Sequence, residues 1–150
     1  VSKELGRVGR IVKVDPTLIN IACENGYVPV VCSVASAGDH TALNVNADSA
    51  AAAVAVAVRA QKLLVLSDTD GVLSEKEDPA SLISRLSVSQ ANQMVESGKA
   101  DKGMVPKLRS AIDALKGGVP SVHLINGRLP NSILLEIFTD SGIGTMIVDG

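Results

Sequence analysis

The fold class follows from residues 105–125, which read V-P-K-L-R-S-A-I-D-A-L-K-G-G-V-P-S-V-H-L-I. Apolar residues recur at helical spacing through the first part, and Gly117-Gly118 ends the pattern. The apolar stripe consists of Met104, Leu108, Ile112 and Leu115. Residues 119–125 then form a short apolar run typical of a buried strand. A helix that leads directly into such a strand is the repeating unit of parallel α/β folds.

The same alternation continues in both directions along the chain. Further strands are predicted at 28–34, 62–67 and 144–148. Two further helices have a predicted N-cap: one from Pro16 to Gly26, capped by Asp15, and one from Ala47 to about Ala60, capped by Asn46. Two more are predicted from Ser87 or Ser89 to about Gly98, and from about Pro130 to a point before Gly142. We therefore predict one α/β domain over residues 1–150, a three-layer αβα arrangement with a mainly parallel sheet.

Three segments need separate interpretation. Residues 6–14 predict a strand that joins this chain to structure outside it, and residues 34–45 predict a hairpin at the sheet edge, with Gly38-Asp39 in its middle. The helix predicted at 47–60 is apolar on nearly all sides, which indicates burial.

The composition argues against several classes of function. The chain has 150 residues, is 46% apolar and carries a net charge of −2, with one Tyr, one Phe and no Trp. It can bury a core, but it lacks the basic stripe and the aromatic rings that bind nucleic acid. The longest apolar run, residues 50–58, is too short to cross a membrane, and no signal peptide is evident. Cys23 and Cys32 are expected to be buried thiols in a reducing cytoplasm, and no metal site is predicted.

A first polar motif, Asn44-Val45-Asn46-Ala47-Asp48, lies where the hairpin enters a helix. Asn46 can cap this helix, and Asp48 suits the positive end of its dipole, so local helix chemistry explains part of the motif. A helix mouth beside strand ends is also where open α/β sheets bind ligands.

A second motif, L-S-D-T-D-G-V-L at residues 66–73, leaves the carboxyl end of a strand that we expect to be central. Asp-x-Asp-Gly is ordinary turn chemistry. The position favours a binding role as well, because a nucleotide would lie at this edge of the sheet.

A third motif, G-M-V-P-K at residues 103–107, places Lys107 near a helix N-terminus, since Pro106 fits only the first turn. The helix dipole disfavours a cation there by a few tenths of a kcal/mol to about 1 kcal/mol. A bound polyphosphate would remove this conflict, whereas a solvated surface lysine is the alternative. His40 and His123 have no second ligand at suitable spacing, and we interpret both as non-catalytic.

In this order, the three motifs and G-I-G-T-M-I at residues 142–147 resemble the amino acid kinase family, whose fold is carbamate kinase-like. They are most similar to the members that phosphorylate N-acetyl-L-glutamate. The resemblance implies transfer of the γ-phosphoryl group of ATP, with Mg²⁺, to the γ-carboxylate of N-acetyl-L-glutamate in arginine biosynthesis. It also implies that the chain is the C-terminal, nucleotide-binding half of such an enzyme, is inactive alone and lacks the N-terminal substrate-binding half.

The resemblance implies roles for individual residues. Asp48 would organise the catalytic lysines, and Lys107 would stabilise the phosphoryl group during transfer. Asn44 and Asn46 would bind the acetylglutamate. The nucleotide pocket would comprise Asp68, Thr69, Asp70, Gly71, Val72, Leu73, Lys99, Ala100, Asp101, Gly103 and Met104.

The C-terminal motif is similar to that of family members inhibited by arginine, and it implies that Glu136, Gly142 and Gly144 bind that effector. Asn131 departs from the histidine that such members often carry. The resemblance further implies a homo-oligomer for the full-length protein and a PII signalling protein as a candidate partner. The implied location is the cytoplasm, or the plastid stroma in a plant or alga.

Three alternatives remain. Another kinase of the family, acting on aspartate, glutamate, carbamate or UMP, would carry a similar half. A nucleotide-binding regulatory module would keep the pocket without catalysis. A plain α/β scaffold would use the motifs only as caps and turns, and Lys107→Glu would then stabilise it, whereas the same change would weaken a nucleotide site.

Overall fold

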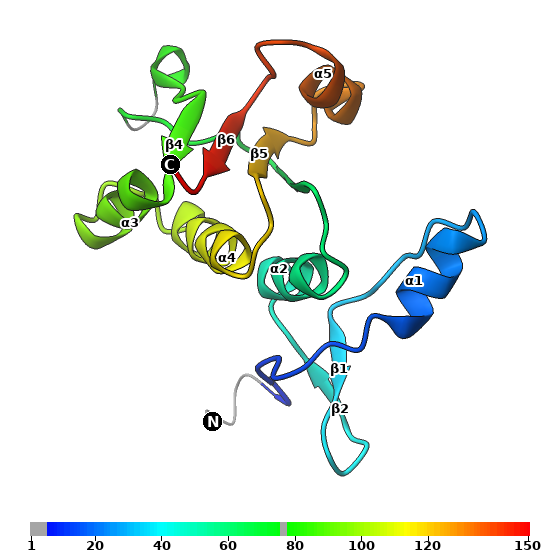
Figure 1. The fold of residues 1–150 in the computed structure, drawn as a ribbon. Coiled ribbons are helices and arrows are strands. Elements are labelled where there is room, and N and C mark those ends of the chain that lie inside the picture. Colours follow the sequence, from blue (N-terminus) through cyan, green and yellow to red (C-terminus); the bar gives the residue numbers. More distant parts are fainter. Residues whose placement is uncertain (1–5, 76–77) are drawn as a thin grey trace.

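The computed structural model describes residues 6–75 and 78–150, and its main sheet has four strands (Figure 1). Its strands lie in the order β3 (Leu63–Ser67), β5 (Val122–Asn126), β6 (Thr145–Val148) and β4 (Arg85–Ser87). The β3–β5 and β4–β6 pairs are parallel, and the β5–β6 pair is antiparallel. The prediction of a mainly parallel sheet is confirmed. Within the described sheet, however, β3 is an edge strand rather than a central one.

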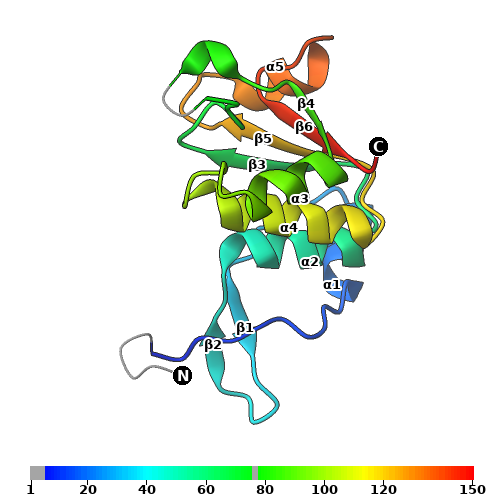
Figure 2. The same ribbon diagram turned by 90° about the vertical axis from the view of Figure 1, so that its left-hand side faces the viewer.

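Helices cover both faces of this sheet. Figure 2 shows α3 (Val88–Glu96) and α4 (Met104–Lys116) on one face and α5 (Ser132–Phe138) on the other. Helix α2 (Ala47–Ala57) lies on the far side of α4. Helix α1 (Thr17–Glu24) and the antiparallel hairpin of β1 (Val34–Ser36) and β2 (Ala42–Asn44) lie beyond α2, and a short 3₁₀ helix spans Pro79–Ser81. The predicted three-layer arrangement is confirmed. The predicted hairpin forms, but it is a separate two-stranded sheet and does not lie at the edge of the main sheet.

Helix α4 supplies much of the core. The stripe residues Met104, Leu108, Ile112 and Leu115 are all buried, and Leu108 is fully inaccessible to solvent. Burying a leucine side chain contributes about 1.5–3 kcal/mol, so this stripe fixes α4 against its neighbours. The helix packs between α2 and α3 and against β5.

The helix caps follow the sequence closely. The side-chain oxygen of Asn46 accepts a hydrogen bond of 2.9 Å from the backbone N–H of Ser49, as predicted for α2. Ser87, rather than Ser89, caps α3. Helix α1 begins at Thr17, one residue later than predicted, and its N-cap is Pro16 rather than Asp15. The Asp15 carboxylate nevertheless accepts bonds from the Thr17 hydroxyl and N–H, which hold the pKa of Asp15 below its ordinary value.

Two predicted strands are wrong. In the run 28–34 only Val34 belongs to a strand, and Val28 and Val30 are 88% and 96% exposed. In residues 6–14 the pairing is a single bridge between Val8 and Asn44. Apolar residues predict burial but do not specify the surface that buries them. The backbone of residues 6–14 pairs with the end of β2, at Asn44, and this contact is too short to form a strand.

Two predictions of burial are also wrong. Cys23 and Cys32 are exposed, because they belong to the segment around α1 that lies outside the core. In α2 only Ala52 and Ala55 are buried, since α4 covers one side of this helix. The helix ends at Ala57, and Arg59 beyond it adopts a positive φ of 54°. No helix among the described residues is long and apolar enough to cross a membrane.

The substitution Leu108→Ala tests the role of α4. Because this side chain is fully buried, we expect the free energy of unfolding to fall by about 2–5 kcal/mol in urea denaturation. Arg109→Ala, on the exposed side of the same helix, is the control and should change stability by less than about 0.5 kcal/mol. Equal effects of the two changes would contradict this description of the core.

Candidate functional site

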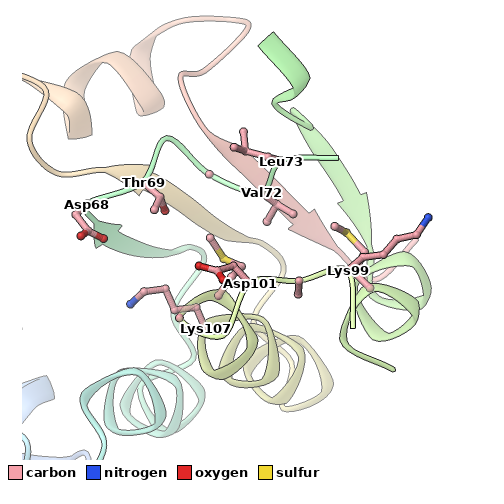
Figure 3. A pocket seen from close by; sticks show the side chains of 12 residues that line it. Asp68, Thr69, Val72, Leu73, Lys99, Asp101 and Lys107 are labelled. Atoms are coloured by element: carbon pink, nitrogen blue, oxygen red, sulfur yellow. The ribbon is translucent and has the colours of Figure 1, made fainter. Parts of the chain in front are cut away.

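A cavity of about 500 Å³ lies between the loop that follows β3 and the N-terminus of α4 (Figure 3). Its walls come from the loop after β3, from α3 with the loop that follows it, and from the first turn of α4. The lining residues are Asp68, Thr69, Gly71, Val72, Leu73, Met94, Lys99, Ala100, Asp101, Gly103, Met104 and Lys107. The structure thus brings together every residue predicted for the nucleotide pocket except Asp70, and it adds Lys107 and Met94.

Met94 is the lining residue that the sequence reasoning missed. It lies on α3, whose apolar side includes the buried Ala91 and the half-buried Val95. This amphipathic pattern indicates a helix that faces the core, but it does not show that one apolar side chain reaches a cavity.

The loop after β3 is fixed by hydrogen bonds from its backbone. The N–H of Val72 donates to the Thr145 hydroxyl at 2.8 Å, and this hydroxyl donates to the carbonyl of Ile83 at 2.7 Å. Gly71 is buried and has a φ of +146°, a backbone conformation that residues other than glycine rarely adopt. Thr145, which does not line the cavity, therefore holds this part of the cavity wall in place from behind.

Asp70 is the exception among the predicted pocket residues. Its carboxylate accepts a hydrogen bond of 2.7 Å from the side chain of Asn126, the last residue of β5. The Asn126 oxygen in turn accepts a bond from the N–H of Arg128. Because it bonds to the neighbouring strand end, Asp70 supports the loop and does not line the cavity. Asn126 and Arg128 were not predicted, since a contact between two parallel strand ends leaves no local pattern in sequence.

Lys107 and Asp48 join the first turns of two helices. The Lys107 ammonium lies 3.2 Å from each carboxylate oxygen of Asp48. The two side chains are only 22% and 20% exposed, so solvent screens the pair less than it screens a surface pair. A cation that the helix dipole disfavours thereby has a carboxylate partner on α2.

The N-terminus of α4 also satisfies part of its own backbone. The carbonyl of Asp101 accepts hydrogen bonds from the N–H groups of Met104 and Val105, at 2.9 and 3.0 Å. The amides of these two residues are therefore engaged within the chain. Lys107, rather than those amides, is the group on α4 best suited to bind an anion in the cavity.

Charged groups lie at both ends of the cavity. In Figure 3 the ammonium of Lys107 lies at the end near Asp68, whereas Lys99 lies at the opposite end and extends outward. An elongated ligand with a charged phosphate end and an apolar body would fit walls that combine Lys107 with Val72, Leu73 and Met94.

Asn44 and Asn46 lie outside this cavity. Asn46 uses its side-chain oxygen to cap α2. Asn44 is exposed at the end of β2, where its backbone pairs with Arg7 and Gly9. The structure therefore does not bring these two side chains into the lining of the cavity.

Glu136 and Gly142 meet at a separate, buried place on the α5 side of the sheet. One carboxylate oxygen of Glu136 lies 2.6 Å from Nδ1 of His123, and the other accepts a bond of 2.7 Å from the N–H of Ile143. The His123 ring also contacts the Ser121 hydroxyl at 3.0 Å. Both oxygens of this predicted effector-binding carboxylate are thus engaged within the chain.

Comparisons with known proteins agree with the motifs. A family model described as "Amino acid kinase family" matches residues 1–126. The acetylglutamate kinase of Moorella thermoacetica is 45% identical over 147 residues, which are 98% of this chain and 50% of that protein. That of Caldanaerobacter subterraneus subsp. tengcongensis is 48% identical, over 96% of this chain and 48% of that protein. The chain therefore spans about half the length of these curated relatives.

A solved structure extends the likeness to the three-dimensional fold. N-acetylglutamate synthase from Neisseria gonorrhoeae, complexed with coenzyme A and L-arginine, superposes with a TM-score of 0.86 at 31% sequence identity. The match covers 96% of this chain and 33% of that one.

Two glycines of the cavity provide a matched test of its geometry. A Cβ at Gly71 would lie 2.6 Å from the Thr145 hydroxyl, so Gly71→Ala should cost roughly 1–3 kcal/mol of stability. Gly103 has a helical φ of −73° and no atom within 4 Å of a Cβ. Gly103→Ala should therefore be neutral or stabilise by up to about 1 kcal/mol. Urea denaturation of both variants measures the difference, and similar costs would refute this geometry.

Proposed function

The chain belongs to the amino acid kinase family, and we propose that it forms the nucleotide-binding half of an enzyme that phosphorylates N-acetyl-L-glutamate. In this proposal the γ-phosphoryl group of ATP passes to the γ-carboxylate of the acceptor, a step of arginine biosynthesis. The names of the two bacterial relatives support this substrate. Because the chain spans only about half their length, the complete activity belongs to the proposal.

The observation that carries the proposal is the Lys107–Asp48 pair at one end of the cavity. Phosphoryl transfer needs positioning and neutralisation of charge more than it needs covalent help from the protein. Lys107 lies at a fixed place in the cavity wall and can bind a phosphate oxygen. Asp48 holds the ammonium from the side of α2 and so acts as its positioning partner. The acceptor carboxylate is already ionised, so the reaction requires no general base.

The residues present are compatible with a magnesium nucleotide. Among the described residues no cluster of three or more His, Cys, Asp or Glu could hold a metal ion. Mg²⁺ in phosphoryl-transfer sites is commonly held by substrate phosphates with one or two carboxylates. Asp68 is a carboxylate of the cavity lining near Lys107 (Figure 3) and is our candidate. When bound, Mg²⁺ would neutralise negative charge on the phosphates.

The acceptor is assigned to the side of the molecule that carries β2. Asn46 uses its amide oxygen for the α2 cap, so Asn44, which is exposed, is the better candidate for contact with acetylglutamate. We propose that most of the acceptor pocket belongs to the other half of a longer enzyme. The exposed apolar run at 28–34 would pack against that half. Arginine control through Glu136, Gly142 and Gly144, a PII partner, oligomer formation and a cytoplasmic location stay predictions.

A second candidate function is a regulatory module without catalysis. The likeness to the gonococcal synthase, a protein named for a different reaction and solved with L-arginine, favours this candidate. Nucleotide binding that depends on Lys107 would exclude a module that binds arginine alone. A chain that binds arginine but no nucleotide would support the regulatory module.

Calorimetric titration with MgADP tests the proposed site. Lys107→Ala should weaken binding about tenfold or more, because it removes a charged contact to phosphate. Lys102→Ala is the control, since Lys102 is an exposed lysine of the same segment that does not line the cavity. Equal Kd values for the two variants would contradict the assignment of Lys107, provided that circular dichroism shows both to be folded.

Turnover by the chain alone is a separate expectation. With MgATP and N-acetyl-L-glutamate, the 150-residue chain should produce no ADP above background, because most of the acceptor pocket would be missing. A coupled assay for ADP measures this, and Lys107→Ala shows the background. A rate that depends on both acetylglutamate and Lys107 would overturn the division into two halves.

A further inference from the structure

We propose that Thr145, on β6, is a positioning residue of the nucleotide site. Its hydroxyl would hold the loop at Gly71-Val72 in the shape that lines the cavity, although Thr145 itself is not a lining residue. This inference rests on the proposed function and extends it to a residue on another strand.

The position of the hydroxyl supports this role. Thr145 is fully buried, and its hydroxyl accepts a hydrogen bond of 2.8 Å from Val72 N–H and donates one of 2.7 Å to the carbonyl of Ile83. One side chain therefore joins the loop after β3 to the segment that leads into β4. A buried amide without a partner is unfavourable, so Val72 is held where this hydroxyl can reach it.

The loop and the hydroxyl are also matched in shape. At Gly71 a Cβ would lie 2.6 Å from the Thr145 hydroxyl oxygen and 3.1 Å from the Thr145 nitrogen. The loop therefore approaches β6 as closely as a glycine allows. A shift of Thr145 would move Gly71 and Val72, which line the cavity directly.

Thr145 is itself held firmly on its other side. Gly144 lies tightly against the carbonyl of Leu124 on β5, which leaves no room for a Cβ. The N–H of Ile143 donates to Glu136, whose other oxygen lies against His123. The backbone before Thr145 is thus fixed to β5 and α5. The hydrogen bond from Val72 N–H to the Thr145 hydroxyl then fixes the loop relative to these elements.

Three variants separate positioning from general stability. Thr145→Val keeps the shape of the side chain and removes the hydroxyl, Thr145→Ser keeps the hydroxyl, and Thr145→Cys replaces it with a weakly bonding thiol. Ile147→Val is the control, because Ile147 is a fully buried residue of the same strand that does not line the cavity.

We expect the Val72 amide to exchange with deuterium faster in Thr145→Val than in the wild type. In calorimetry with MgADP, Thr145→Val should raise Kd about tenfold, because the Val72 amide loses the hydroxyl that holds it in the cavity wall. Thr145→Cys should show the same direction, and it takes the place of the Val variant if that variant does not fold. Thr145→Ser and Ile147→Val should bind MgADP within about twofold of the wild type.

The outcomes distinguish this inference from the proposed function. A folded Val or Cys variant that binds MgADP with the wild-type Kd would overturn the role of Thr145 and leave the nucleotide site intact. A folded Ser variant that loses as much affinity as the Val variant would also overturn it, because the hydroxyl would not be the cause. A wild-type chain that binds no MgADP would refute the nucleotide site itself, and the role of Thr145 with it.

Discussion

The packing of α4 is the interaction on which the site depends. The buried stripe that includes Leu108 and Ile112 fixes this helix against β5 and between α2 and α3. Its first turn is thereby placed opposite the loop that follows β3, and the cavity lies between them. Because α2 packs on the same helix, Asp48 meets Lys107. Helix packing thus brings together a carboxylate and an ammonium that are 59 residues apart in sequence.

The sheet positions the opposite wall of the cavity, which is the loop after β3. The carboxyl ends of parallel strands meet at one edge, so Asn126 at the end of β5 can hold Asp70 after β3. The β6 strand, which runs antiparallel to β5, brings Thr145 under the same loop. The cavity is therefore shaped by contacts behind its walls as much as by the residues that line it.

The sequence predicted those parts of the fold whose signals are local. A stripe of apolar residues at helical spacing predicted α4. Single residues predicted the helix starts: Asn46 as the N-cap of α2, and Ser87 as one of two candidates for the N-cap of α3. Most of the cavity lining was implied by the resemblance to the family, whose motifs lie on short continuous segments of this chain. Contacts between distant segments, such as those of Asn126 and Thr145, leave no comparable pattern. The strand predicted at 28–34 was wrong for a related reason. Apolar residues predict burial, but they do not indicate which surface buries them.

Nuclear magnetic resonance of the ¹⁵N-labelled chain during titration with MgADP tests the central claim most directly. The claim is that a nucleotide occupies the cavity between the loop after β3 and the first turn of α4. It predicts that amide shifts concentrate in residues 68–73 and 99–107. The Val72 amide should be among those that move. Shifts confined to α5 and residues 136–144, or no shifts in a folded chain at saturating MgADP, would contradict it.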